Sequence, residues 1–213
     1  MLFFLSIAIL ATGLVDLYAI SRKKQTWRYG FKPGTMVWVI LLAITGPETD
    51  LYSWLIVAGL VCSLAGDIFL VLPSDRFIQG LTSFFMAHLF YIGAFLMIVT
   101  EWSPSSMIIF GLLLAVIAGL FAYKILPRAK THGGGTLQAA VFSYILVITL
   151  MVWLACMTYN PWIITGALLF FISDAILAWD RFVHKLSWGN MAVMITYFSA
   201  QYLIALSIWA TTF

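Results

Sequence analysis

Two aspartates lie inside apolar runs of the sequence, in surroundings that resemble each other. Asp67 lies within AGDIFLVLPSDRF, residues 65–77, and Asp174 lies within ISDAILAWDRF, residues 172–182. A pair of carboxyl groups can divide the work of acid–base catalysis when one environment keeps a proton and the other keeps a charge. We therefore predict that Asp67 and Asp174 form a functional pair. The alternative is that each aspartate forms a buried structural hydrogen bond.

The composition places these aspartates in a membrane protein. Of the 213 residues, 63% are hydrophobic and 9% are charged, with a mean hydropathy of +1.05. Soluble domains carry roughly 25% charged residues, so a bilayer is the solvent that suits this chain. A carboxylate at the centre of a bilayer costs at least about 2.5–3.5 kcal/mol, which makes both aspartates candidates for function. The basic residues form no patch, so we predict no nucleic-acid partner.

Eight apolar segments can be recognised. They are Leu2–Ile20, Pro33–Gly46, Leu51–Leu72, Phe77–Val99, Ser105–Lys124, Thr136–Met157, Pro161–Trp179 and Gly189–Thr211. A helix needs about 20 apolar residues to span a bilayer, and only the second segment is too short, although it could begin at Tyr29. The first segment is long for a signal peptide and lacks a basic start. The sequence therefore predicts an all-α bundle of eight transmembrane helices that forms one membrane domain over residues 1–213.

The charged connections predict the topology. All eleven Lys and Arg residues fall in the first, third, fifth and seventh connections when Lys124, the last residue of its segment, is counted with the fifth, and the other connections carry only Glu48, Asp50 and Glu101. Cytoplasmic connections are rich in Lys and Arg. We therefore predict that the odd-numbered connections are cytoplasmic and that both termini lie on the opposite side. We expect an integral protein of a bacterial inner membrane.

The two aspartate motifs also indicate an internal repeat. When Asp67 is aligned with Asp174, Gly59 aligns with Gly166, and the shift is four predicted helices. An even shift gives both halves the same orientation, so we predict a parallel four-plus-four repeat with halves of about 1–104 and 105–213. Each aspartate is six residues from the predicted cytoplasmic end of its helix. This distance is roughly 9 Å, and the carboxyl groups would face each other at one depth.

A histidine and a tyrosine are predicted to support the aspartates. Phe84, His88 and Tyr91 are spaced to share one face of a helix. His88 aligns with Val193 of the second half, so the histidine belongs to one half only. A buried histidine is often a packed core residue, and this is the alternative for His88.

Other polar residues receive weaker assignments. Lys32, Arg76 and Arg181 lie at the predicted cytoplasmic boundary, where an arginine can form paired hydrogen bonds to a phosphate. We predict that they bind an anionic headgroup, and the alternative is that they only set the topology. Asp16 lies close to a basic connection, which favours a place at the membrane interface.

No sequence pattern predicts a metal or an organic cofactor. The cysteines, Cys62 and Cys156, lie inside apolar runs and are predicted to be packed thiols. No His-Glu-x-x-His motif or cysteine pair is present. His132 and His184 fall in connections and receive no role.

Several motifs resemble those of the YhhN-like lysoplasmalogenase family. They are FKPGT before the second segment, GDIFLVL, FxxGLxxFFMAHLFY from Phe77 to Tyr91, and GALLFFISDAILA. The resemblance extends over nearly the whole chain. It implies an eight-helix membrane enzyme that hydrolyses the vinyl ether bond of lysoplasmalogens, a lysophospholipid substrate. The products would be a fatty aldehyde and glycerophosphoethanolamine or glycerophosphocholine. The suspected catalytic carboxylates of the family match Asp67 and Asp174.

That reaction suits two carboxyl groups. One protonates the β-carbon of the vinyl ether, and the other stabilises the resulting oxocarbenium ion and orients water, as in glycoside hydrolysis. No cofactor is required. An intramembrane aspartyl protease is disfavoured, because Leu64-Ala65-Gly66 precedes Asp67 where a Gly-x-Gly-Asp motif would be needed. A transporter or a non-enzymatic lipid-binding protein is the remaining alternative.

Overall fold

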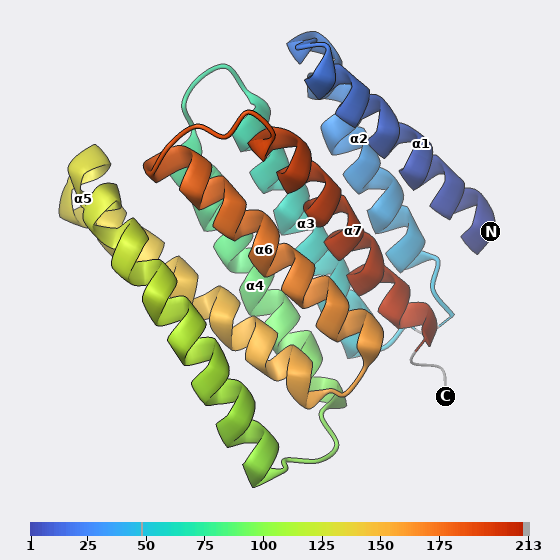
Figure 1. Ribbon diagram of the computed structural model, residues 1–213. Coiled ribbons are helices and arrows are strands. Elements are labelled where there is room, and N and C mark those ends of the chain that lie inside the picture. Colours follow the sequence, from blue (N-terminus) through green and yellow to red (C-terminus); the bar gives the residue numbers. More distant parts are fainter. Residues whose placement is uncertain (48, 211–213) are drawn as a thin grey trace.

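The computed structural model describes residues 1–47 and 49–210, and this part of the chain contains helices and no strands (Figure 1). Glu48, in the second predicted connection, and Thr211, at the end of the last predicted segment, lie outside the described residues. The helices are α1 Leu2–Ser21, α2 Gln25–Ile44, α3 Leu51–Val71, α4 Phe77–Ile98, α5 Pro104–Met157, α6 Pro161–Phe182 and α7 Gly189–Ala210.

Six of these seven helices are long and apolar enough to cross a membrane, all except α2. The prediction of an all-α membrane protein is confirmed. The predicted segments Ser105–Lys124 and Thr136–Met157 both fall within α5, where Gly133 and Gly134 interrupt the helical torsion angles, and the number of eight helices stays a prediction. The four-plus-four repeat stays a prediction.

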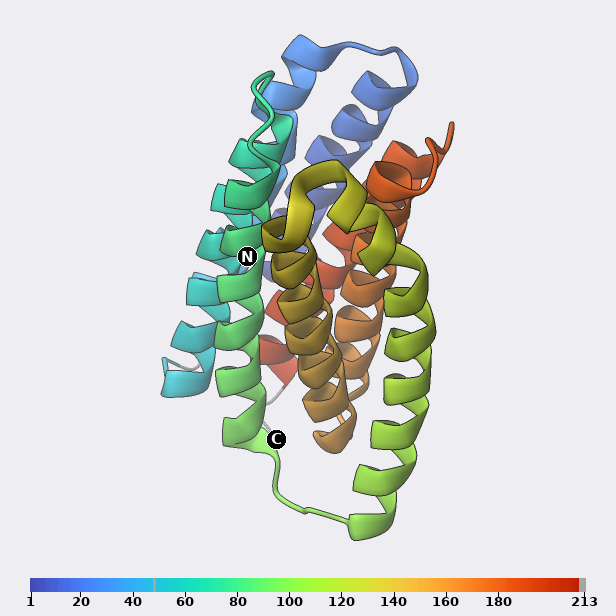
Figure 2. The ribbon, with the colours of Figure 1, turned by 90° about the vertical axis from the view of Figure 1, so that its left-hand side faces the viewer.

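Helix α5 doubles back on itself near its middle (Figure 2). Gly133 and Gly134 have non-helical torsion angles there, and Gly134 has a φ of 69°. Glycine adopts positive φ without the steric cost that a side chain would add. The reversal divides α5 into a first arm, residues 104–132, and a second arm, residues 135–157.

Helix α2 begins at Gln25, two turns before the predicted start at Pro33. Arg28 and Lys32 are therefore part of this helix rather than of a connection. They are four residues apart and share one helical face, from which each contacts a buried aspartate of a neighbouring helix. These ion pairs connect the part of α2 on the N-terminal side of the proline to α1 and α3.

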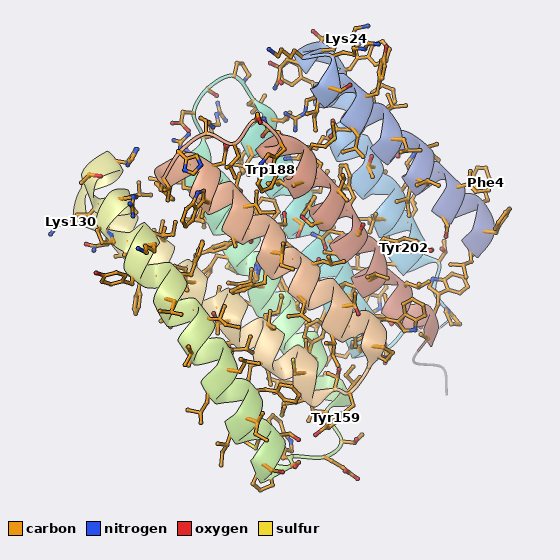
Figure 3. The ribbon with its side chains drawn as sticks, viewed as in Figure 1. Phe4, Lys24, Lys130, Tyr159, Trp188 and Tyr202 are labelled. Carbon is orange, nitrogen blue, oxygen red and sulfur yellow. The ribbon has the colours of Figure 1, made fainter. Side chains whose placement is uncertain are left out.

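One end of the bundle gathers the α1–α2, α3–α4 and α6–α7 connections and the reversal of α5 (Figure 1). We call this the basic end. Lys24 and Lys130 lie there, whereas Tyr159 lies at the opposite end (Figure 3). The predicted odd-numbered connections thus share one end of the molecule, and the membrane face to which it belongs stays a prediction.

Close packing of α3 against α4 sets the position of Asp67. A Cβ atom on Gly66 would lie 2.6 Å from Cε2 of Phe84, so a larger residue would push the two helices apart. Phe84 continues into a buried aromatic cluster, with ring centroids 6.1 Å from Phe170 and 5.8 Å from Tyr197. This cluster joins α4, α6 and α7, and its member Tyr197 contacts Asp67.

Candidate active site

Asp67 is surrounded by groups that stabilise its charged form. Its exposed fraction is 1%, and Nζ of Lys32 lies 3.0 Å from Oδ1. The hydroxyl of Tyr197 donates a hydrogen bond of 2.7 Å to Oδ2. Charge-assisted hydrogen bonds of this kind are stronger than neutral ones and favour the carboxylate over the carboxylic acid. Helices α2, α3 and α7 thus place a cation and a hydroxyl donor against Asp67, and both contacts favour its carboxylate form.

Asp174 has a different set of partners, from α4 and α5. The Tyr144 hydroxyl donates a hydrogen bond to Oδ2, and Nε2 of His88 lies 3.9 Å from the same oxygen. The Asp174 side chain is 14% exposed. Within residues 1–47 and 49–210, it forms no ion pair with Lys or Arg.

The protonation of His88 follows from its hydrogen bond. Nδ1 contacts the carbonyl oxygen of Phe84, which can only accept, so the proton of the neutral ring is assigned to Nδ1. Nε2 is then an acceptor, and it is buried without a hydrogen-bond partner among the described residues. A lone pair directed toward a carboxyl group favours the protonated form of that group.

Both aspartates line one pocket of about 390 Å³, which we call the polar pocket. Its lining includes five basic residues, namely Arg28, Lys32, Arg76, Arg181 and Lys185. In the part of the chain that the structure describes, Arg76 is the member of this set without a carboxylate partner. Its Nε donates to Oγ of Ser74, 3.0 Å away. The Arg76 guanidinium keeps further donors for an anion in the pocket.

The predicted headgroup-binding residues share this pocket, in two different settings. Arg76 and Arg181 lie at its mouth, and Arg181 binds Asp75 at 2.5 Å. This guanidinium donates a hydrogen bond that lowers the pKa of Asp75. Lys32 is instead 4% exposed and paired with Asp67. Because α2 begins earlier than predicted, the Lys32 side chain lies inside the bundle, and its role in headgroup binding stays a prediction.

A second, apolar pocket of about 50 Å³ adjoins the polar one. We call it the apolar pocket. It lies among α4, α5 and α6, and both pockets are lined by Phe84, Asp174 and Leu177. Asp174 therefore lies where the polar and the apolar pocket meet, whereas Asp67 lines the polar pocket and not the apolar one.

The two predicted supporting residues have different positions. His88 is fully buried and faces Asp174. The Tyr91 hydroxyl donates to Oε1 of Gln201 at 2.7 Å instead of contacting either aspartate. Sequence reasoning missed Tyr144 and Tyr197, because these hydroxyls reach the aspartates from positions 30 and 130 residues away. No spacing in the sequence could have indicated such contacts.

Asp16 and the cysteines complete the set of predicted residues. Asp16 has an exposed fraction of 0% and lies 3.5 Å from Nε of Arg28. The early start of α2 brings a buried cation against Asp16, and the predicted place of Asp16 at the membrane interface stays a prediction. Cys62 and Cys156 are free thiols, and the described residues contain no group of three or more His, Cys, Asp or Glu that could hold a metal ion.

Comparison with known proteins identifies relatives of the chain. Lysoplasmalogenase TMEM86B of Mus musculus is 37% identical over 156 residues, which cover 73% of this chain and 63% of that protein. Lysoplasmalogenase TMEM86A of Bos taurus is 32% identical, covering 80% of this chain and 72% of that protein. The membrane protein YhhN of Escherichia coli O157:H7 is 29% identical, covering 89% of this chain and 91% of that protein.

The chain thus spans less than two thirds of the length of mouse TMEM86B. No solved structure showed a significant match to the chain. A sequence profile of the YhhN family matches residues 27–208. This range includes both aspartates, His88 and all five basic residues of the polar pocket. The chain belongs to the YhhN family.

Proposed function

We propose that this protein is a lysoplasmalogenase, which hydrolyses the vinyl ether bond of a lysoplasmalogen to a fatty aldehyde and a glycerophospho-alcohol. The observation that carries the proposal is the contrast between two carboxyl groups on one pocket. Asp67 is paired with a buried lysine, and Asp174 faces a neutral histidine at the edge of an apolar space. The relatives named lysoplasmalogenase support the same reaction.

In this mechanism Asp174 is the general acid. Its proton passes to the β-carbon of the vinyl ether, and the positive charge that develops is shared between the α-carbon and the ether oxygen. The neighbouring lone pair on Nε2 of His88 favours the proton on Asp174 before the reaction. The junction of the two pockets suits this step, because the ether oxygen lies between a polar glycerol and an apolar chain.

Asp67 is the fixed anion of the mechanism. A carboxylate that is already oriented stabilises the oxocarbenium ion without reorganisation during the reaction. Water then adds to the α-carbon and gives a proton to the Asp174 carboxylate. The hemiacetal collapses to the aldehyde and the alcohol, so that one water is consumed and the acid is restored. The roles resemble those of the carboxyl pair in glycoside hydrolysis.

The polar pocket would hold the headgroup. The substrate phosphate is an anion, and Arg76 and Arg181 supply planar donors at the mouth. Ethanolamine and choline both carry a positive charge, for which Asp75 and Asp180 on the same lining are suitable partners.

The direct test uses protein purified in detergent and a synthetic lysoplasmalogen, with release of the fatty aldehyde measured by mass spectrometry. We expect aldehyde from the vinyl ether lipid and none from the saturated 1-O-alkyl lipid of equal length. Asp174→Asn serves as the matched variant and should release almost none. Binding of the lipid without any aldehyde would instead favour the lipid-binding or transport alternative.

We also propose eight membrane crossings within a single membrane domain, with each arm of α5 and helix α2 as separate crossings and the basic end in the cytoplasm of a bacterial cell. A reporter that is active only in the cytoplasm should be active after Arg128, on the α5 reversal, and silent after Phe213. Activity at both sites would contradict this topology.

A further inference from the structure

The space beyond Asp174 along the bundle axis is filled by rings. Phe170 has its ring centroid 4.7 Å from that of His88, 5.5 Å from that of Tyr197 and 6.4 Å from that of Tyr91. Phe170, His88 and Tyr91 have an exposed fraction of 0%. A long hydrocarbon chain that starts beside Asp174 therefore has no room to continue toward the opposite end of the bundle.

The apolar pocket leads sideways instead. It shares Phe121, Phe171 and Ala175 with an outer groove of about 350 Å³ between the first arm of α5 and α6. The wide parts of this path are the polar pocket and the outer groove, and the apolar pocket of about 50 Å³ is the narrow passage between them. The path thus runs from Asp174 to the outer surface of the bundle.

The surroundings of the outer groove suit an aliphatic chain in a bilayer. Trp179 and Trp188 line the groove toward the basic end, and Trp188 lies on the α6–α7 connection (Figure 3). The first arm of α5 exposes apolar side chains such as Leu112, Val116 and Leu120 along its length. Tryptophan is enriched at membrane–water interfaces, and the exposed aliphatic residues suit the hydrocarbon region.

We propose that the single hydrocarbon chain of the substrate leaves the active site laterally, through the passage at Ala175 and along the groove between the first arm of α5 and α6. This inference rests on the proposed function and names the part of the site that recognises the chain. Among the apolar pockets found in residues 1–47 and 49–210, the one at this passage is lined by a candidate catalytic aspartate. One apolar outlet accepts one chain, which selects lipids with one tail over lipids with two.

The first experiment narrows the passage. Ala175→Phe places a ring between the apolar pocket and the outer groove, and Ala11→Phe is the matched control on the exposed surface of α1. Turnover is measured with lysoplasmalogens that carry a hexadecenyl or a butenyl chain. We expect kcat/KM of Ala175→Phe to fall about tenfold or more for the hexadecenyl lipid and to change little for the butenyl lipid.

Equal losses for both chains, or no loss for either, would overturn the proposal. Ala11→Phe should match the wild type with both lipids. If Ala175→Phe does not fold, Phe121→Trp narrows the same passage from α5, where the side chain is half-buried, and the same chain-length contrast is expected.

The second experiment needs no catalysis, so it separates failure of this inference from failure of the proposed function. A 1-O-alkyl lysophospholipid with a diazirine in the middle of its chain has no vinyl ether to cleave. After illumination, mass spectrometry should locate the label on the first arm of α5 and on α6, and Ala175→Phe should reduce it. Labels mainly on α1, α2 or α7, or labelling that Ala175→Phe leaves unchanged, would overturn the lateral path.

Discussion

Asp67 and Asp174 lie in similar sequence motifs but have opposite surroundings. Asp67 is fully enclosed, beside a lysine ammonium and a tyrosine hydroxyl. Asp174 is partly exposed to two pockets, beside a tyrosine hydroxyl and a histidine nitrogen without a proton. The difference comes from the neighbouring helices, because α2 supplies Lys32 and α4 supplies His88. A motif therefore supplies a carboxyl group, and the surrounding helices decide whether that group keeps a charge or a proton.

Removal of either carboxyl group should have the largest effect on activity. Loss of a general acid or base typically lowers the rate by about 10²–10⁴-fold, so Asp67→Asn and Asp174→Asn should both be nearly inactive. The double variant should be little worse than either single variant, because groups that act as a unit are strongly non-additive. Aldehyde release in single-turnover and steady-state assays measures this. Wild-type turnover in one of the two variants would remove that aspartate from the mechanism.

The same two variants should differ in stability. Asp67→Asn leaves the Lys32 ammonium buried without its anion, and such a loss typically costs about 3–5 kcal/mol. Asp174→Asn leaves no buried lysine or arginine unpaired, so we expect a change below about 1 kcal/mol. Thermal unfolding in detergent should separate the two. Equal losses of stability would contradict the different charge states that we assign.

Lys32→Met combined with Asp67→Leu tests whether the buried ion pair is needed for folding or for catalysis. Replacement of a buried pair by apolar residues is often neutral or stabilising, so the double variant should regain the stability that Asp67→Asn loses. It should remain inactive, because no anion is left to stabilise the oxocarbenium ion. Recovery of aldehyde release would show that Asp67 has no catalytic role.

Variants of His88 should have a smaller effect than those of the aspartates. His88→Gln keeps an oxygen that can accept a hydrogen bond, whereas His88→Phe fills the space without an acceptor. We expect His88→Gln to retain much more turnover than His88→Phe, with similar thermal unfolding temperatures. If both retain nearly full turnover, His88 is only a packing residue of the aromatic cluster.

The exposed pair of Asp75 and Arg181 should have the smallest effect. Its arginine lowers the pKa of Asp75, so the pair stabilises the fold above the unfolded-state pKa of about 3.9 and loses this effect as the pH falls through the lower folded-state value. Exposed pairs are worth about 0.2–1 kcal/mol and are weakened by salt. Arg181→Gln should therefore change the unfolding temperature slightly at neutral pH and not at all in strong acid. A large fall in unfolding temperature at neutral pH would show that this exposed pair stabilises the fold as strongly as the buried pair of Lys32 and Asp67.

The early start of α2 is the main difference between the helix bounds predicted from the sequence and those of the structure. The predicted segment began at Pro33, but α2 begins two turns earlier, and this part of the helix carries Arg28 against Asp16 and Lys32 against Asp67. The spacing of four between these cations was the available signal. This spacing becomes informative only when α1, which carries Asp16, and α3, which carries Asp67, are known to pack against α2.

The sequence by itself determined the membrane environment, most helix boundaries and the family, and it predicted the two carboxyl groups and His88 as site residues. These features depend on composition, periodicity and motifs, which involve residues that are close together in the sequence. Only the tertiary structure decided the partners of each aspartate, the place of Arg28 and Lys32 within α2, and the sideways apolar path. Those features depend on side chains that meet across helices, and a hydroxyl 130 residues away from Asp67 leaves no local pattern in the sequence.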